Sequence, residues 1–302
     1  MNSSKLSLAD LLTLLTAIGF GFICFLSMNF LNFGDTRNSI LVSSIIATFL
    51  FFTAFVAKLL KRTTKNFKAS FIAEVILLVI FTAGIILFSI SPFPHYFAVS
   101  ENKSEIQNKL SNSISQSEKM FLEYETYAQS RKIFYKSTLN RVVAEKNTNS
   151  NQFNDFGFQN GNDVNKQIDN MMFTIHADLF PSNYLDMKTA DSTWLADART
   201  SVENWKPIGV VNVITNVDKR TNESLTKLVE LSTVRENGEI TQDFCFPLEF
   251  EDLKTDFTVI TPPTILTITL CFLAWALMLF SWFVTKRDGK RLTSVEKYEV
   301  VL

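Results

Sequence analysis

The sequence is poor in the residues on which nucleophilic and metal chemistry most often depends. It contains two histidines, His95 and His176, among 302 residues. His176 and Asp178 are only two positions apart, so a helix would point them to different sides, and no further ligand follows at the spacing of a zinc site. Serine-nucleophile, phosphate-loop and H-E-x-x-H motifs are also missing. We therefore expect no catalytic, metal or cofactor-binding site and no enzymatic activity.

Cysteine is equally scarce, with three in the chain. Cys24 and Cys271 lie inside apolar runs, which leaves Cys245 as the one cysteine of the polar region. An intrachain disulfide is therefore not expected. We expect Cys245 to be a small core residue, with an intermolecular bridge as the alternative.

Charge is rare in two parts of the sequence and frequent in a third. Residues 11–91 and 262–284 hold few ionisable side chains, whereas residues 101–257 are rich in Asn, Lys, Asp, Glu and Ser. The averages over the chain, 47% apolar residues, 20% charged residues and a mean hydropathy of +0.13, hide this division. The division predicts a membrane part joined to a soluble part.

Four apolar runs are long enough for transmembrane helices, each of which needs about 20 residues. Three lie within residues 1–91 and the fourth follows after a long gap; they cover about 11–31, 40–60, 71–90 and 262–285. A signal peptide is the alternative for the first run, but an A-x-A cleavage sequence is missing and another span follows closely. The sequence therefore predicts a mainly α-helical membrane protein with three plus one transmembrane helices.

The distribution of Lys and Arg predicts the orientation, because cytoplasmic loops carry the excess. Basic residues gather between the second and third spans and again in the tail 286–302; they are Lys58, Lys61, Arg62, Lys65, Lys68, Lys286, Arg287, Lys290 and Arg291. Lys58 lies at the end of the second span, where its long stem can reach the interface. Both termini are therefore expected in the cytoplasm, with residues 92–261 on the other side. The composition suggests a bacterial inner membrane, so this domain is periplasmic or extracellular.

The extracytoplasmic domain reads as a helical bundle. Residues 102–146 contain an apolar stripe at helical spacing, with a break expected near Ser111–Ser117. Further helices are predicted at 164–179 and 185–205, and a long loop at 147–163. Residues 208–217 are β-branched enough for a strand, but their spacing favours a helix. Residues 240–261 are expected to be extended, with one or two short strands.

The spans carry little that indicates transport. Glu74 is the one candidate for an intramembrane acid, and its position favours an interfacial salt bridge over a proton relay. Small residues four apart, Ala17 and Gly21 in the first span and Ser43 and Ala47 in the second, can bring helices close together. Such pairs serve packing within the monomer as well as oligomerisation.

The predicted domain is acidic, because residues 92–261 contain 17 Lys and Arg against 24 Asp and Glu, a net charge of −7. This balance opposes binding to nucleic acid. We expect a membrane-anchored scaffold or interaction subunit of an envelope complex, in contact with the lipid bilayer and with a protein partner or further copies of itself. The alternatives are a ligand sensor that signals through a partner and a channel-like oligomer lined by Thr13, Thr16 and Asn29.

Overall fold

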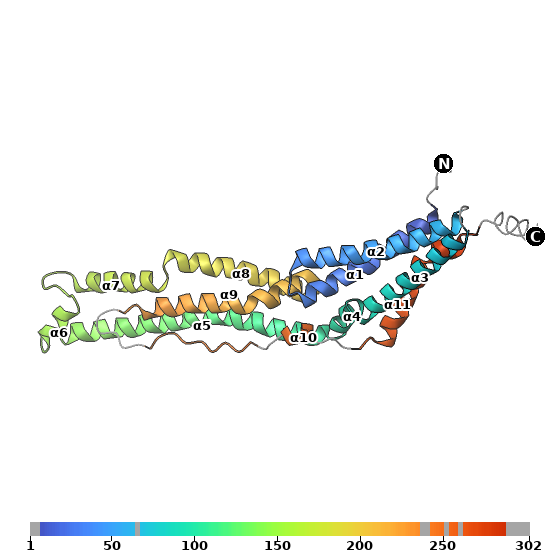
Figure 1. The fold of residues 1–302 in the computed structure, drawn as a ribbon. Helices are drawn as coiled ribbons and strands as arrows, with labels where there is room; N and C mark the ends of the chain where they lie inside the picture. Colours follow the sequence, from blue (N-terminus) through green and yellow to red (C-terminus); the bar gives the residue numbers. More distant parts are fainter. Residues whose placement is uncertain (1–6, 64–66, 236–241, 251–253, 259–261, 288–302) are drawn as a thin grey trace, which may run out of the picture. The chain divides into compact units, whose positions relative to one another are not determined.

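The computed structural model describes residues 7–63, 67–235, 242–250, 254–258 and 262–287. Within these ranges all regular elements are helices and no strand is present, so the predicted helical fold is confirmed. The chain divides into two compact units (Figure 1). Unit 1 comprises residues 1–105 and 253–302, and unit 2 comprises residues 106–252.

Unit 1 is built from long apolar helices. Three stretches are long and apolar enough to cross a membrane: Leu8–Leu31, Thr36–Arg62 and Lys68–Glu101. The helices of the unit are α1 (Leu8–Leu31), α2 (Thr36–Arg62), α3 (Phe67–Ile90), α4 (Phe93–Glu101), α10 (Lys254–Thr258), α11 (Ile265–Met278) and α12 (Phe280–Val284). The C-terminal apolar stretch is therefore present as a shorter helix, α11, which is interrupted at Leu279 before α12 begins.

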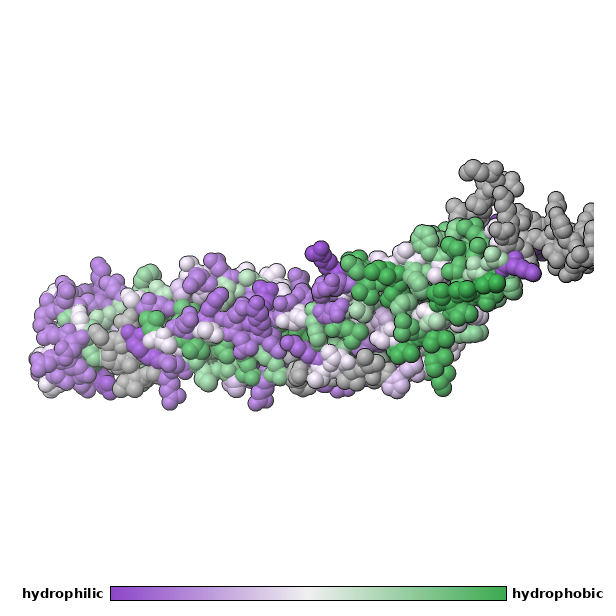
Figure 2. Space-filling model, in the orientation of Figure 1, coloured by the Kyte–Doolittle hydropathy of each residue, from purple (hydrophilic) through white to green (hydrophobic). Residues whose placement is uncertain are grey.

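The outer surface of unit 1 is apolar, as the concentration of hydrophobic colour over α1, α2, α3 and α11 shows (Figure 2). Large side chains stand open on each of these helices; among them are Ile18, Phe22, Ile45, Phe52, Ile76, Val79, Ile268 and Phe272, all more than half exposed. A continuous apolar surface of this kind is rare on proteins that fold in water. It fits a multi-pass membrane protein.

The close approach of α1 to α2 explains the small residues of these helices. A β-carbon built on Gly21 would lie 2.7 Å from Cβ of Ala47 and 3.3 Å from the carbonyl oxygen of Ser43. The two small-residue pairs therefore face each other inside one chain. Packing within the monomer accounts for them.

The C-terminal helix packs into the interior of unit 1. Nε1 of Trp275 donates to Oγ1 of Thr82 on α3 across 3.2 Å. Cys24 and Cys271 are both free and buried in the same apolar cluster. The ring of Phe20 stacks on that of Phe93 at 4.5 Å, which joins α4 to α1.

Unit 2 is organised around the 42-residue helix α5 (Lys103–Ala144). Its other helices are α6 (Ser150–Asp155), α7 (Val164–Leu179), α8 (Ser182–Glu203) and α9 (Pro207–Thr233). The predicted break near Ser111–Ser117 is wrong. The hydroxyls of Ser113 and Ser117 donate to the carbonyls four residues earlier, at 3.2 and 2.9 Å, so these serines bond within the helix instead of competing with it.

Two further predictions for unit 2 need correction, and one is confirmed. The stretch 147–163 is not all loop, because Asn149 caps α6 and the buried ring of Phe153 stacks on Phe158 at 4.9 Å. The short strands expected after residue 240 are absent from 242–250, which is extended without a partner strand, and residues 254–258 are helical. Residues 208–217 are helical, as favoured, because burial of Val210, Ile214 and Val217 on one face of α9 outweighs their strand propensity.

Tyr124 lies at the centre of the unit 2 core. Its ring is fully buried and lies within 6.2 Å, centroid to centroid, of the rings of Tyr127, Phe180, Tyr184 and Phe244. Its hydroxyl donates to the carbonyl of Leu179 at the end of α7, across 2.9 Å. Burial raises the pKa of Tyr124, so the phenol stays protonated as this donor.

Replacing Gly21 by alanine should lower the free energy of unfolding by about 1–3 kcal/mol, because the added methyl overlaps Ala47. Gly19 is a matched control, since a β-carbon there meets nothing within 4 Å. Unfolding of the purified protein in detergent, followed by circular dichroism during titration with SDS, measures both variants. Equal stabilities of Gly21→Ala and Gly19→Ala would contradict the packing described.

Candidate functional site

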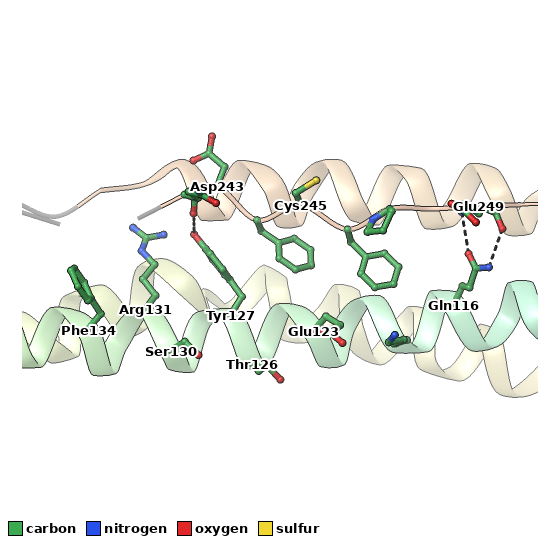
Figure 3. Close-up of a pocket in the computed structure, with 15 residues that line it drawn as sticks. Gln116, Glu123, Thr126, Tyr127, Ser130, Arg131, Phe134, Asp243, Cys245 and Glu249 are labelled. Carbon is green, nitrogen blue, oxygen red and sulfur yellow. Dashed lines mark hydrogen bonds between the residues drawn. The ribbon is translucent and has the colours of Figure 1, made fainter. Parts of the chain in front are cut away.

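A hollow of unit 2 lies between α5 and the extended segment Gln242–Phe250 (Figure 3). Its volume is about 1090 Å³. We call it the α5 groove; it is lined by Gln116, Lys119, Glu123, Thr126, Tyr127, Ser130, Arg131, Phe134, Gln242, Asp243, Phe244, Cys245, Phe246, Pro247 and Glu249. The lining is mixed, with aromatic rings beside carboxylates, an ammonium group and amides.

Side chains of α5 hold the segment at both ends of the groove, as the dashed lines of Figure 3 show. At one end the hydroxyl of Tyr127 donates to the carbonyl of Gln242 across 2.8 Å. At the other end the amide of Gln116 donates to the carbonyl of Glu249 at 2.9 Å and accepts from its N–H at 3.2 Å. The segment therefore runs antiparallel to α5.

The two anchors enclose unequal lengths of helix and extended chain. Gln116 and Tyr127 are eleven residues apart, which is about 16 Å along a helix at 1.5 Å per residue. Gln242 and Glu249 are seven residues apart, which is about 23 Å of extended chain at 3.3 Å per residue. The segment between its two anchors is therefore longer than the stretch of helix beside it, and the groove lies between the two.

Side chains of the segment alternate in exposure, as in a β-strand with one buried face. Phe244 is buried and Phe246 and Leu248 are partly buried, whereas Asp243, Cys245, Pro247 and Glu249 are exposed; these are the residues that alternate. The prediction of Cys245 as a core residue is therefore wrong. Side chains of an extended chain alternate between two sides. Because Phe244 and Phe246 point inward, the thiol of Cys245 between them points outward.

The end of α9 is tied to α5 beside the groove by a buried arginine. The guanidinium of Arg131 donates to the carbonyl of Ser232 at 2.9 Å and to the carbonyl of Val234. These carbonyls belong to the C-terminal turn, where a cation is favoured by the helix dipole. Oγ of Ser232 accepts the N–H of Phe244 at 2.9 Å, so this turn also holds the segment.

Three charged groups of the groove have no ion-pair partner among the residues that the structure describes. They are Lys119 and Glu123 of α5 and Glu249 of the segment. Neighbouring charges outside the groove are paired, for example Glu125 with Lys188 and Glu118 with Arg199. Within the described part of the chain, the groove therefore has two carboxylates and one ammonium group without an ion-pair partner, beside Arg131 and Asp243, which have partners.

Unit 1 contains a second polar site, buried where α1 begins and α2 ends. Asp10 and Lys58 are each 3% exposed and form an ion pair. Oγ of Ser281 on α12 also donates to the Asp10 carboxylate, at 2.5 Å, and the N–H of Ser7 donates to it at 2.9 Å. Lys58 is therefore paired inside the unit, with its ammonium group buried beside Asp10.

A second ion pair joins α3 to the residues after α12. Glu74 is 1% exposed in its side chain and accepts from Arg287 at 2.9 Å and from Nε1 of Trp282 at 3.0 Å. Nζ of Lys61 donates to the carbonyl of Trp282 at 2.8 Å and lies 4.1 Å from the centre of its ring. The prediction that Glu74 is a salt-bridge partner is confirmed. We call Asp10, Lys58, Lys61, Glu74 and Arg287 the charge cluster.

The break between α11 and α12 forms part of the same arrangement. Oγ1 of Thr13 on α1 donates to the carbonyl of Met278, the last residue of α11, across 3.0 Å. A carbonyl at a helix break needs such a donor in an apolar environment. The interruption at Leu279 is therefore supported by α1, and it brings Ser281 and Trp282 to the two ion pairs.

The histidines hold no metal site within the described part of the chain, where no group of three potential ligands occurs. His176 is exposed, with Nδ1 3.3 Å from Nζ of Lys132. His95 is 2% exposed in the interior of unit 1. Neither residue contributes to the α5 groove or to the charge cluster.

Two features were missed in the sequence, and both had a signal. Asp10 was missed because the first span was predicted to begin at residue 11. The signal was its position: an acid near the start of one helix lies beside a base near the end of the next, here Lys58, when the two helices are antiparallel. The groove was missed because residues 240–261 were expected to be extended, but no position beside a helix was predicted for them. Phenylalanine at 244, 246 and 250 already shows the alternation of a segment with one buried face.

Replacing Lys58 by methionine should lower the free energy of unfolding by about 3–5 kcal/mol, because Asp10 is then a buried charge without a partner. Adding Asp10→Asn should recover most of this loss, since the amide needs no counter-charge and keeps its bonds to Ser7 and Ser281. SDS titration in detergent measures the wild type, both single variants and the double variant. A double variant no more stable than Lys58→Met would contradict the pairing.

Comparison of the chain with protein-family models, with curated proteins and with solved structures finds no match. Relatives therefore indicate neither an activity nor a binding partner. The geometry of the α5 groove and of the charge cluster is the basis on which a function can be inferred.

Proposed function

We propose that the chain spans the membrane four times, with α1, α2, α3 and the pair α11–α12 as its spans. The last pair covers residues 265–284, a length of about 30 Å if helical throughout, which matches the hydrocarbon core. The break within it is compatible with a membrane because the hydroxyl of Thr13 donates to the buried carbonyl of Met278. Three plus one spans put both termini on one side and residues 92–261 on the other.

The basic residues support a cytoplasmic location for the termini. Lys58, Lys61 and Arg62 end α2, Lys68 lies in the first turn of α3, and Arg287 follows α12. All belong to ends of helices that this topology puts on the same side, as the positive-inside rule requires. In a bacterial inner membrane the domain 92–261 is then periplasmic.

We further propose that the protein is an interaction subunit of an envelope complex, anchored by unit 1 and binding a partner protein through unit 2. The observation that carries this function is the α5 groove, an open hollow that combines aromatic side chains with free charges. A protein surface with these properties can bury apolar area and pair its charges across an interface.

A ligand sensor is the second candidate, and the volume of the groove favours it, since small-molecule pockets measure about 300–1,000 Å³. Such pockets, however, enclose most of the ligand surface, whereas the groove is open along the segment. A channel-like oligomer has no supporting observation. The hydroxyls of Thr13 and Thr16 donate to carbonyls of Met278 and Leu12 and are not free to line a pore.

The native cysteines test the topology. A membrane-impermeant maleimide added to intact spheroplasts should label Cys245, which is exposed, and leave the buried Cys24 and Cys271 unlabelled. A Lys286→Cys variant in a Cys245→Ser background should react after permeabilisation alone. Labelling of position 286 from outside, or protection of Cys245, would contradict the proposed orientation.

Site-specific photo-crosslinking tests the interaction. Thr126 is exposed in the groove and Thr226 is exposed on α9 away from it. A benzoylphenylalanine at position 126 should give a discrete protein adduct in living cells, and the same residue at 226 should not. Equal adducts at both positions, or none at either, would contradict partner binding at the groove.

A further inference from the structure

One cation of the charge cluster has no carboxylate partner within the described part of the chain. The two acids of the cluster are each paired with another base. Lys61 is half-buried, and its ammonium group donates to the carbonyl of Trp282 across 2.8 Å. Because an ammonium group has three donors, Lys61 can bond a further acceptor. A half-buried cation is stabilised best when that acceptor carries a negative charge.

Aromatic rings surround the basic groups at this end of unit 1. Nζ of Lys61 lies 4.1 Å from the centre of the Trp282 ring. Cζ of Arg287, which is paired with Glu74, lies 5.0 Å from the centre of the Phe71 ring. The ends of α2, α3 and α12 therefore meet here, with cations and rings side by side. In the proposed topology these ends lie at the cytoplasmic surface, where indole rings and basic groups contact lipid headgroups.

The charges at this end of unit 1 favour an anionic ligand. The described residues include six bases and two acids, a net charge of +4; they are Lys58, Lys61, Arg62, Lys68, Lys286, Arg287, Asp10 and Glu74. Basic residues beside a membrane surface attract acidic lipids. A zwitterionic headgroup would bring its own cation close to these bases, so an acidic headgroup is the better complement.

A row of four aromatic rings leads from Lys61 along α12 and α11. The ring centres of Trp282 and Phe283 are 5.1 Å apart, and those of Phe283 and Trp275 are 6.1 Å apart. Phe272 continues the row, 5.6 Å from Trp275, and is 67% exposed. Ten residues of helix cover about 15 Å, which is half of the hydrocarbon core of about 30 Å. The aromatic row from 282 to 272 therefore has the length of one leaflet.

We propose that Lys61 and the aromatic row bind an acidic phospholipid of the cytoplasmic leaflet, with the phosphate at the ammonium group and one acyl chain along the rings. The proposal rests on the proposed topology and goes beyond the interaction through unit 2. A free phosphate ion shares the chemistry of the headgroup, but it has no apolar part to cover the exposed rings. A phospholipid supplies the charge and the apolar chain together, which is why it is the occupant we favour.

The tryptophans of the aromatic row report on the site. The full chain is reconstituted in phosphatidylcholine bilayers that contain increasing fractions of phosphatidylglycerol with brominated acyl chains, and tryptophan fluorescence is measured. Brominated phosphatidylcholine at the same fractions is the reference. Bromine quenches at short range, so Trp275 and Trp282 respond, whereas Trp194 and Trp205 belong to unit 2 and give a constant background. We expect phosphatidylglycerol to be preferred about fivefold.

Three variants separate the site from the general charge of the surface. Lys61→Gln should lower the preference to less than about twofold, because the amide lacks the charge but can still donate to the carbonyl of Trp282. Lys61→Arg keeps the charge and should keep the preference. Lys68→Gln removes an exposed base at the same end of unit 1 and should keep at least half of the preference. If Lys61→Gln does not fold, the two brominated lipids still test the wild type.

Equal quenching of the wild type by the two brominated lipids would overturn the proposal. Equal losses in Lys61→Gln and Lys68→Gln would also overturn it, because they indicate diffuse attraction to the surface. Loss of the preference on adding inorganic phosphate at constant ionic strength would indicate an anion site without a lipid. The crosslink from position 126 reports on unit 2 and persists if the lipid site alone fails, whereas labelling of position 286 from outside would remove the topology and the lipid site together.

Discussion

The extended segment that returns along α5 needs hydrogen-bond partners for its backbone, and the helices of unit 2 provide them. The segment Gln242–Phe250 is extended but has no partner strand, so backbone groups that face the helices need side-chain partners. Gln116, Tyr127 and Ser232 supply them. Each lies on a helix whose opposite face is buried in the bundle, so α5 and α9 serve the core and the segment together.

The same requirement explains why Arg131 is buried. The segment can be held by Ser232 only if the last turn of α9 keeps its position, and the guanidinium of Arg131 fixes the carbonyls of that turn. Tyr124 connects this arrangement to the rest of the core, because its ring contacts Phe244 and its hydroxyl holds the end of α7. The groove is therefore built against the buried core of unit 2. A binding surface held in place in this way loses little conformational freedom on association.

The apolar periodicity of α5 and the spacing in α7 were sufficient to predict these helices, because burial on one face dominates their stability. The break proposed at Ser111–Ser117 failed since serine hydroxyls can bond either within a helix or outside it, and the sequence does not distinguish the two. The path of residues 242–250 could not be predicted, because it depends on which side chains of distant helices reach it. The Asp10–Lys58 pair lies between these cases: its residues are visible in the sequence, but pairing them required the antiparallel register that Gly21 and Ala47 fix.

The charges of the two units differ in a way that bears on function. In the charge cluster, Asp10 and Glu74 have cationic and hydroxyl or indole partners, and such saturated, buried pairs hold helices in one arrangement. A relay or transport site would instead need a group free to change its partner. In the groove, Glu123 and Glu249 are exposed and form no ion pair with any residue that the structure describes. Binding gains free energy where a polar group replaces its contact with water by a stronger contact with a partner. The carboxylates of Glu123 and Glu249 can make such a contact with a bound protein.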